Sequence, residues 1–245
     1  METVFRQTHK IAAIHTDRYG RLKPSAILFF AQNAADKHCT ALSLDWETMA
    51  SRGLFWAIIR HRVQISRLPK IGETVTVETW PMPTTRSAFP RATAAYDAQG
   101  KELFRCISLW VLMDIQTRAM VLPGKSGVTL NGLLQGTELA LPSSIVPKAL
   151  DNFATRKVCY TDLDRNGHMN NTRYLDWIDD LLPSQFHINH SAREFTVCYL
   201  SEAREGQTMR LNYQIVNGPL LQVDGYREEN SGETGPRIFS AQIVF

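Results

Sequence analysis

Residues 158–183 read VCYTDLDRNGHMNNTRYLDWIDDLLP, and this stretch decides how the rest of the chain is interpreted. It opens with a short apolar run, residues 158–160, that is long enough to predict one strand. Polar and turn-forming residues follow, and they include Asp164, Asn166 and His168. A carboxylate, an amide and an imidazole therefore stand at every second position directly after a predicted strand.

The remainder of the stretch has helical spacing. Its apolar side chains recur at intervals of three and four, at Tyr174, Leu175, Ile178, Leu181 and Leu182. Asn170 or Asn171 is suited to cap this helix, because a short amide side chain can accept hydrogen bonds from the first turn. Pro183 is expected to end it. The three polar groups thus lie at the entrance of a buried helix, where we expect a chemical site.

The composition is that of a soluble globular protein, with 44% hydrophobic and 21% charged residues among 245. This length allows one large domain or two of about 120 residues. No apolar run approaches the roughly 20 residues that a membrane span needs, and residues 1–6 lack the apolar core of a signal peptide. The four cysteines are far apart, which indicates neither a disulfide framework nor a zinc site: Cys39, Cys106, Cys159 and Cys198. We therefore expect a cytoplasmic protein without a metal or cofactor.

The net charge of +3 and the isoelectric point near 8.7 make the chain mildly basic. Its densest basic group is Arg60-His61-Arg62, followed by Arg67 and Lys70, and this group falls in a run with strand character. A nucleic-acid binder normally gathers its basic residues more strongly, so no nucleic-acid partner is expected. Two interpretations of the group remain, a solvated strand face or a contact with an acidic protein partner.

Helices and strands are also predicted in the rest of the chain. Pro24 can begin a helix, since its missing amide costs nothing at the first position, and residues 25–35 are apolar on nearly every side, as in a fully buried helix. A shorter helix is expected at 44–50, before Gly53. Apolar or alternating runs predict strands at the start of 10–23 and at 54–65, 75–79, 92–96, 103–113, 119–122, 195–199, 209–215 and 239–245. The pattern disappears from 124 to 150, which indicates a linker or crossing segment.

The second half repeats the first. Residues 17–22, DRYGRL, match residues 164–169, DRNGHM, at an offset of 147 (164 − 17), and residues 71–73 resemble 205–207 at an offset of 134 (206 − 72). The second copy is therefore shorter by about a dozen residues, a difference that we assign to the helix at 44–50. A repeated unit of one buried helix wrapped by an antiparallel sheet predicts an α+β protein with a tandem, or double, hot-dog fold whose two sheets are continuous.

Two kinds of metal site are less well supported. Residues 162–167 match the opening of a calcium-binding loop, but the twelfth position, which should be a glutamate, is Arg173. His187 and His190 resemble a metal-binding pair, yet no third ligand lies at a useful spacing. We interpret both histidines as loop residues.

A cysteine nucleophile would need Cys159 or Cys198 beside His168. Both cysteines fall in apolar runs with strand character, where a thiol is usually an inert core group. Asp164 and Asn166 could in turn serve only to form the turn and cap the helix, which is a common use of both residue types. The residues alone therefore leave the chemistry of this stretch open.

The segment LDRNGHMNN at 163–171, with Tyr174 and Trp177 following in register, resembles the acyl-acyl-carrier-protein (acyl-ACP) thioesterases, a plant and bacterial family of double hot-dog enzymes. The resemblance extends to YLSEAR at 199–204 and, more loosely, over both halves. It implies four catalytic residues: Asp164, Asn166, His168 and Glu202.

Position 203 departs from the plant pattern. Plant members carry a cysteine directly after the glutamate, whereas this chain has Ala203, which disfavours a cysteine mechanism. The resemblance then implies hydrolysis of a thioester, with Asp164 or Glu202 as the general base or with one of them forming an acyl anhydride. Asn166 and His168 would orient the water or the carbonyl, and amides at the start of the following helix would receive the oxyanion.

The expected organisation has three parts, a non-catalytic N-terminal hot-dog unit, a linker and a C-terminal hot-dog unit with the catalytic residues, at 1–123, 124–150 and 151–245. At the positions of the amide and the imidazole the first copy has Tyr19 and Arg21, and at that of the glutamate it has Leu68. An arginine stays protonated and cannot exchange a proton as an imidazole does. The first copy is therefore expected to hold the acyl chain or the carrier.

The resemblance also implies the partner, a small acidic carrier protein that bears a phosphopantetheine-linked acyl chain. A mildly basic surface suits that encounter. A hot-dog hydratase or dehydratase acting on acyl thioesters and a non-catalytic acyl-thioester-binding protein remain as alternatives, and a homodimer remains one option for the assembly. The residues do not specify the length or saturation of the acyl chain.

Overall fold

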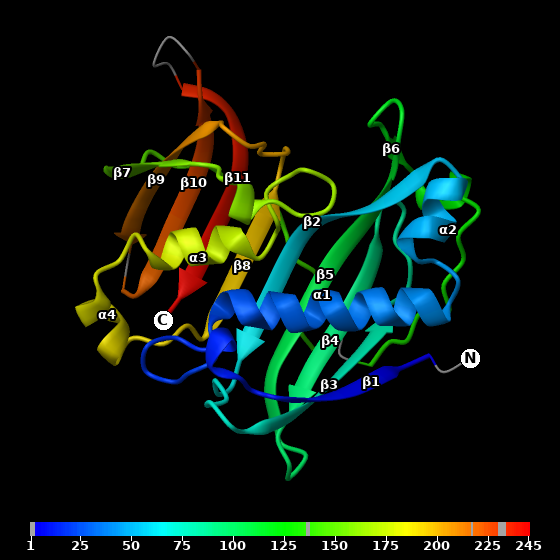
Figure 1. Cartoon of the computed structure of the whole chain (residues 1–245), viewed down its shortest axis with the longest axis horizontal. Coiled ribbons are helices and arrows are strands. Elements are labelled where there is room, and N and C mark those ends of the chain that lie inside the picture. The colour runs from blue at the N-terminus through cyan, green and yellow to red at the C-terminus, as the bar shows by residue number, and fades with distance from the viewer. Residues whose placement is uncertain (1–2, 136–137, 217, 230–233) are drawn as a thin grey trace. The chain divides into compact units, whose positions relative to one another are not determined.

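Helix α1, Pro24–Ala41, begins at a proline, as expected from the sequence. The computed structural model of the chain describes residues 3–135, 138–216, 218–229 and 234–245. In it, α1 lies along one face of a twisted sheet (Figure 1). Its buried side comprises Ser25, Ala26, Ile27, Leu28, Phe30, Ala31, Ala34, Ala35 and His38. The helix is longer than the predicted 25–35. Because Phe29 is 46% exposed, the helix is not buried on all sides, contrary to the prediction from the sequence.

The sheet beside α1 belongs to the first of two compact units, Met1–Pro142. Its strands are antiparallel, in the order β1-β3-β4-β5-β2 with β6 added to β5. They are β1 (Phe5–Lys10), β2 (Leu54–Ile65), β3 (Thr74–Pro81), β4 (Phe89–Tyr96), β5 (Glu102–Asp114) and β6 (Met120–Val121). Helix α1 packs against β3 and β1. The predicted strands at 54–65, 75–79, 92–96, 103–113 and 119–122 are all present.

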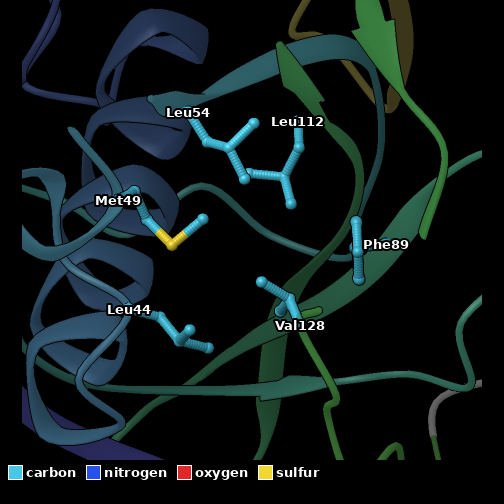
Figure 2. Close-up of a cluster of buried hydrophobic side chains, with 6 residues drawn as sticks. All are labelled: Leu44, Met49, Leu54, Phe89, Leu112 and Val128. Atoms are coloured by element: carbon cyan, nitrogen blue, oxygen red, sulfur yellow. The ribbon is translucent and has the colours of Figure 1, made fainter. Parts of the chain in front are cut away.

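Helix α2, Trp46–Ser51, closes one end of this unit. Asp45 caps it, because its Oδ1 accepts a hydrogen bond of 2.9 Å from the Thr48 amide. Figure 2 shows the apolar cluster around it, which comprises Leu44, Met49, Leu54, Phe89, Leu112 and Val128. Val128 comes from the segment predicted as a linker, as does Gln135, whose carbonyl accepts from Trp80 Nε1 at 3.0 Å. This part of the segment therefore packs within the first unit.

The second compact unit, Ser143–Phe245, repeats the arrangement with the strand order β7-β9-β10-β11-β8. Its elements are β7 (Asn152–Lys157), α3 (Arg173–Asp179), α4 (Ser184–Asn189), β8 (Glu194–Tyr199), β9 (Thr208–Val216), β10 (Leu220–Glu228) and β11 (Thr234–Val244). Tyr174 of α3 contacts Tyr199 and Phe239, with ring centroids 5.4 and 4.8 Å apart, so α3 faces the sheet. Among the described residues, no helix combines the length and apolar character needed to cross a membrane.

The predicted strand at 158–160 is wrong. The strand of that region is β7, and a short 3₁₀ helix, Tyr160–Asp162, follows it. The same difference occurs in the first unit, where β1 precedes a 3₁₀ helix at Ala13–His15. A third such turn is Pro123–Lys125. The strand predictions were based on apolar residues that follow each strand. Of these, Ile11 and Val158 are each 1% exposed, so they are buried in the core although they lie after the end of the strand.

The predicted end of the central helix in the second unit is also wrong. Helix α3 ends at Asp179, and Pro183 caps the start of α4 instead. Since both units carry a second short helix, the shorter second copy is not explained by the helix near 44–50. Most of the difference lies in the central helix, which has 18 residues in α1 and 7 in α3.

The internal repeat extends to the backbone hydrogen bonds. Leu22 N donates to Pro69 O at 2.9 Å, and Met169 N donates to Ala203 O at 2.8 Å. These pairs are related by the two offsets found in the sequence, 147 (169 − 22) and 134 (203 − 69). Each half therefore contains the same turn, held in the same way against the loop that precedes the next strand of its sheet.

Candidate active site

The turn at residues 164–168 is fixed by its aspartate and its glycine. The Asp164 amide donates to the His168 carbonyl at 2.8 Å, and the Gly167 amide donates to the Asp164 carbonyl at 3.0 Å. Gly167 has a φ of +75°, a conformation that favours glycine. Asp164 Oδ1 accepts from the amides of Asn166 and His168 at 2.8 and 3.4 Å. One carboxylate oxygen thus has the structural role that a turn gives to aspartate.

A short antiparallel contact brings the distant glutamate to this turn. His168 and Arg204 form an isolated β-bridge, and the Met169 amide donates to the Ala203 carbonyl. His168 Nε2 lies 2.9 Å from Glu202 Oε2, and Arg204 Nη2 lies 3.4 Å from the same oxygen. The structure therefore places the predicted histidine and glutamate in direct contact.

The contact with Glu202 determines which ring nitrogen of His168 carries the proton. A carboxylate accepts, so the proton of the ion pair or hydrogen bond lies on His168 Nε2. In the neutral ring this leaves the lone pair on Nδ1. The side chain of His168 is 17% exposed and that of Glu202 is 38% exposed, so the pair is partly shielded from water yet open to a substrate.

The other two predicted residues are more exposed. Asn166 is exposed and Asp164 is half-buried. In the part of the chain that the structure describes, no hydrogen bond reaches Asp164 Oδ2 or the side-chain amide of Asn166. A carboxylate oxygen and an amide group can therefore contact a substrate or a water molecule from the same turn.

Behind the turn, Tyr174 supplies a buried hydroxyl. Burial and the nearby Asp164 carboxylate raise the pKa of Tyr174 well above its ordinary value, so the phenol stays neutral. Tyr199, which contacts the same ring, donates its hydroxyl to the Asn171 carbonyl at 2.8 Å. This hydrogen bond connects the end of β8 to the residues that follow the motif, and so it helps to hold the glutamate loop against the turn.

Asp162 has a supporting role that sequence reasoning did not identify. It is 5% exposed, and its Oδ2 accepts from the Cys159 amide at 3.0 Å. Its Oδ1 lies 3.2 Å from Arg173 Nε, and Arg173 also pairs with Asp176 at 2.6 Å. The residue that breaks the calcium pattern is therefore an ion-pair partner of that loop's first aspartate. The sequence feature that could have indicated this role is the pair of opposite charges at Asp162 and Arg173, eleven positions apart.

The amides at the start of α3 are less available than expected. The Thr172 amide donates to Asn170 Oδ1 at 2.9 Å, and the Arg173 amide donates to the Asn170 carbonyl at 3.0 Å. The N-cap position of α3 is Thr172, without a side-chain cap hydrogen bond, so the prediction that Asn170 or Asn171 caps the helix is wrong, and Asn170 instead holds the turn that precedes it. Because these two donors are already used, they do not form the expected oxyanion site.

The remaining sequence candidates lie elsewhere. Cys198 is buried in β8, whereas Cys159 is exposed just after β7, which corrects its placement in a core strand. His187 lies in α4 rather than in a loop, with its Nε2 3.0 Å from the Asp179 carbonyl, and His190 follows that helix and stacks on the ring of Phe186 with a centroid separation of 4.1 Å. Within the described ranges, no group of three or more His, Cys, Asp or Glu residues is arranged to hold a metal ion.

The basic group in β2 divides between the two faces of its strand. His61 is 1% exposed, whereas Arg60 and Arg62 are partly exposed. The interpretation as a solvated strand face therefore holds for the arginines only.

The equivalent turn of the first unit keeps the backbone and changes the side chains. Asp17 Oδ1 accepts from the amides of Tyr19 and Arg21 at 2.8 and 2.9 Å, as Asp164 does in the second unit. Its Oδ2, however, pairs with Arg21 Nη2 at 2.8 Å. By the offset of 134, the position of Glu202 is occupied by Leu68. At the positions of the imidazole and the second carboxylate, the first unit therefore has a guanidinium and an alkyl side chain.

The chain matches one protein family along most of its length. Sequence profiles of the acyl-ACP thioesterase N-terminal domain and C-terminal domain match residues 2–122 and 147–238. The chain belongs to the acyl-ACP thioesterase family. Dodecanoyl-[acyl-carrier-protein] hydrolases of Cinnamomum camphora and Umbellularia californica are 27% and 26% identical over 249 residues, 92% of this chain. The chain spans 65% of the length of each of these plant proteins.

Solved structures show the same fold. An acyl-ACP thioesterase from Bacteroides thetaiotaomicron superposes with a TM-score of 0.90 over 99% of this chain and 98% of its own, at 23% identity. The 12:0-ACP thioesterase from Umbellularia californica superposes with a TM-score of 0.84 over 100% and 97%, also at 23% identity. The predicted α+β double hot-dog fold is therefore confirmed.

Proposed function

We propose that this protein hydrolyses the thioester of a fatty acyl chain carried on the phosphopantetheine of an acidic acyl carrier protein. The observation that carries the proposal is the contact of 2.9 Å between His168 and Glu202, beside the Asp164 turn. It joins the two separate motifs through which the sequence resembles the family. The names of the plant relatives, which describe hydrolysis of dodecanoyl-ACP, support the same reaction.

In the proposed reaction a water molecule attacks the thioester carbonyl with help from a carboxylate. Asp164 Oδ2 is suited to orient or deprotonate that water, because Oδ1 alone is engaged by the turn amides. Glu202 is the second candidate base, and its contact with His168 would place the imidazole beside the same water or carbonyl. The leaving thiol needs little acid assistance, since its pKa is about 8.5.

The developing oxyanion needs hydrogen-bond donors. With the Thr172 and Arg173 amides already used, we assign this role to the side-chain amide of Asn166, which is exposed at the centre of the turn. The first unit would then hold the acyl chain or the carrier, because the Asp17 carboxylate is paired with Arg21.

Release of free thiol from carrier-linked acyl chains of graded length tests the proposal. Thiol release from saturated acyl-ACP, at a rate that depends on the protein concentration, is the expected result. Conversion of enoyl-ACP or hydroxyacyl-ACP without thiol release would instead identify a hydratase or dehydratase. Tight acyl-ACP binding without turnover would identify a non-catalytic binding protein.

A further inference from the structure

The interior of the first unit contains a band of polar side chains that the proposed chemistry does not use. In the described part of this unit seven polar or charged residues are buried, all on α1 or on strands β2 to β5, and six of them form the band. They are His38, His61, Thr79, Arg91, Thr93 and Ser108. Burial of polar groups is unfavourable unless they are hydrogen-bonded, so a band of this size calls for an explanation.

The strand register makes the band continuous. Thr79 lies opposite Thr93, and Thr93 Oγ1 donates to Thr79 Oγ1 at 3.0 Å. Arg91 lies opposite Ser108, which in turn lies opposite His61. Residues directly opposite on antiparallel strands point to the same face of a sheet. His61 Nδ1 and Ser108 Oγ are 2.9 Å apart, so the band crosses four neighbouring strands.

Arg91 gives the band its charge. It is 5% exposed, and its Nη1 lies 3.0 Å from His38 Nδ1 and 3.4 Å from Thr79 Oγ1. Among the described residues, no carboxylate forms an ion pair with it. A guanidinium can only donate, so His38 Nδ1 is the acceptor and the ring is uncharged. The buried guanidinium therefore donates to neutral groups, and the Asp36 carboxylate also stabilises its charge electrostatically.

A cavity of about 460 Å³ adjoins the band at His38. Its lining combines this histidine with apolar and polar side chains, among them Leu42, Leu44, Val128, Leu130, Thr3, Thr129 and Asn131. Leu44 and Val128 also belong to the apolar cluster drawn in Figure 2. The cavity thus has a mixed lining of apolar and polar side chains, and Arg91 lies behind it, in contact with His38.

We propose that this cavity binds acyl chains that carry an oxygen atom, as a hydroxyl or oxo group, and that His38 and Arg91 select for that oxygen. The inference rests on the proposed thioester hydrolysis. The apolar walls suit the methylene groups of the chain. His38, with the guanidinium of Arg91 behind it, favours an oxygen atom over a methylene group at this wall, because a plain alkyl chain offers no hydrogen-bonding group to the polar side chains of the lining.

The test compares a saturated acyl thioester with mono-hydroxy and mono-oxo analogues of the same length, in which the oxygen is moved along the chain. The measured quantity is the ratio of kcat/KM for each oxygenated substrate to that for the plain substrate. This ratio does not depend on the folded fraction of the preparation. We expect one position of the oxygen to raise it about 10-fold or more, the scale of a satisfied polar contact.

Arg91→Met should abolish this preference while the plain chain is still hydrolysed. Thr93→Val, which keeps the shape of the side chain, is the milder variant if Arg91→Met does not fold, and it should reduce the preference. Arg105→Met is the matched control, because Arg105 pairs with Glu102 and Glu138 and does not belong to the band. Its ratio should equal that of the wild type.

Two results would overturn the inference. One is a wild-type ratio at or below one for every position of the oxygen, and the other is a ratio that Arg91→Met and Thr93→Val leave unchanged. In both cases hydrolysis of the plain chain would leave the proposed function standing. Failure to hydrolyse any thioester would remove the proposed function and this inference together.

Discussion

Asp17 and Arg21 form an ion pair in the first unit, with Arg21 Nη2 2.8 Å and Nε 2.9 Å from Asp17 Oδ2. The residue at the position of Arg21 in the second unit is His168, and it contacts Glu202 instead. The two turns therefore share their backbone and differ in what their carboxylates face. A carboxylate oxygen held by a guanidinium in this way is poorly placed to accept a proton from water.

The first prediction follows from this difference. Asp164→Asn should remove nearly all thioester hydrolysis, because it replaces the carboxylate proposed to act on water. Asp17→Asn should leave turnover per folded molecule intact and should lower the free energy of unfolding by about 1 kcal/mol, the typical value of a turn or cap interaction. Turnover and urea unfolding of both variants provide the check. Equal losses of turnover in two folded variants would contradict the division of labour between the units.

The second prediction concerns Glu202. Its replacement in Glu202→Gln removes the negative charge that faces His168 but keeps the size of the side chain. If Glu202 helps to position or deprotonate water, kcat should fall by roughly 10²-fold or more, the scale of losing a general base, while KM changes little. Steady-state kinetics on acyl-ACP measures both quantities. A folded variant with nearly normal kcat would leave Glu202 with a structural role only.

Much of the fold followed from periodicity and from the repeat. Strand β2 occupies the predicted residues Leu54–Ile65, because a long apolar run offers few alternatives. The sequence pattern did not predict strands β1 and β7, whose sequences are FRQTHK and NFATRK. Most of their residues are polar, and only alternate residues are even partly buried. Strand β10 was also missed, because polar residues such as Gln222 and Asp224 are buried within it. Burial of that kind depends on neighbours that sequence patterns do not reveal.

The candidate site was predicted residue by residue, but its supporting contacts were not. The motif placed Asp164, Asn166 and His168 on one turn, and the family resemblance added Glu202 to the site. The hydrogen bond from Tyr199 to the Asn171 carbonyl joins positions 28 residues apart. Such a contact depends on how a helix packs against a strand, and the pattern of residues along the sequence does not indicate it.

The third prediction concerns the cysteines. Ala203 occupies the position of the plant thiol, and Cys198 is buried, so alkylating reagents should modify the exposed Cys159 without abolishing turnover. Mass spectrometry of the alkylated protein, followed by the thiol-release assay after removal of excess reagent, checks this. Rapid inactivation that acyl-ACP protects against, mapped to Cys159 or Cys198, would contradict it and would restore a cysteine nucleophile.

The last prediction concerns acid stability. Burial lowers the pKa of His61 from 6.5 to about 3, so the folded chain keeps this ring neutral where the unfolded chain protonates it. The contribution of neutral His61 to stability is therefore fully present above about pH 6.5 and is lost as the pH falls from there toward about 3. Between about pH 7 and pH 5, this single group should cost the native state on the order of 2 kcal/mol.

His61→Met removes the titrating ring while keeping a buried side chain of similar length, so the variant should lose less free energy of unfolding than the wild type over that pH interval. Urea unfolding of both proteins at the two pH values measures the difference. Ser108→Ala is the matched control, because it removes the hydroxyl that lies 2.9 Å from His61 Nδ1 but leaves the imidazole in place. That control should retain the acid sensitivity of the wild type. If His61→Met is as acid-sensitive as the wild type, then His61 is not the group that couples folding to protons in this range.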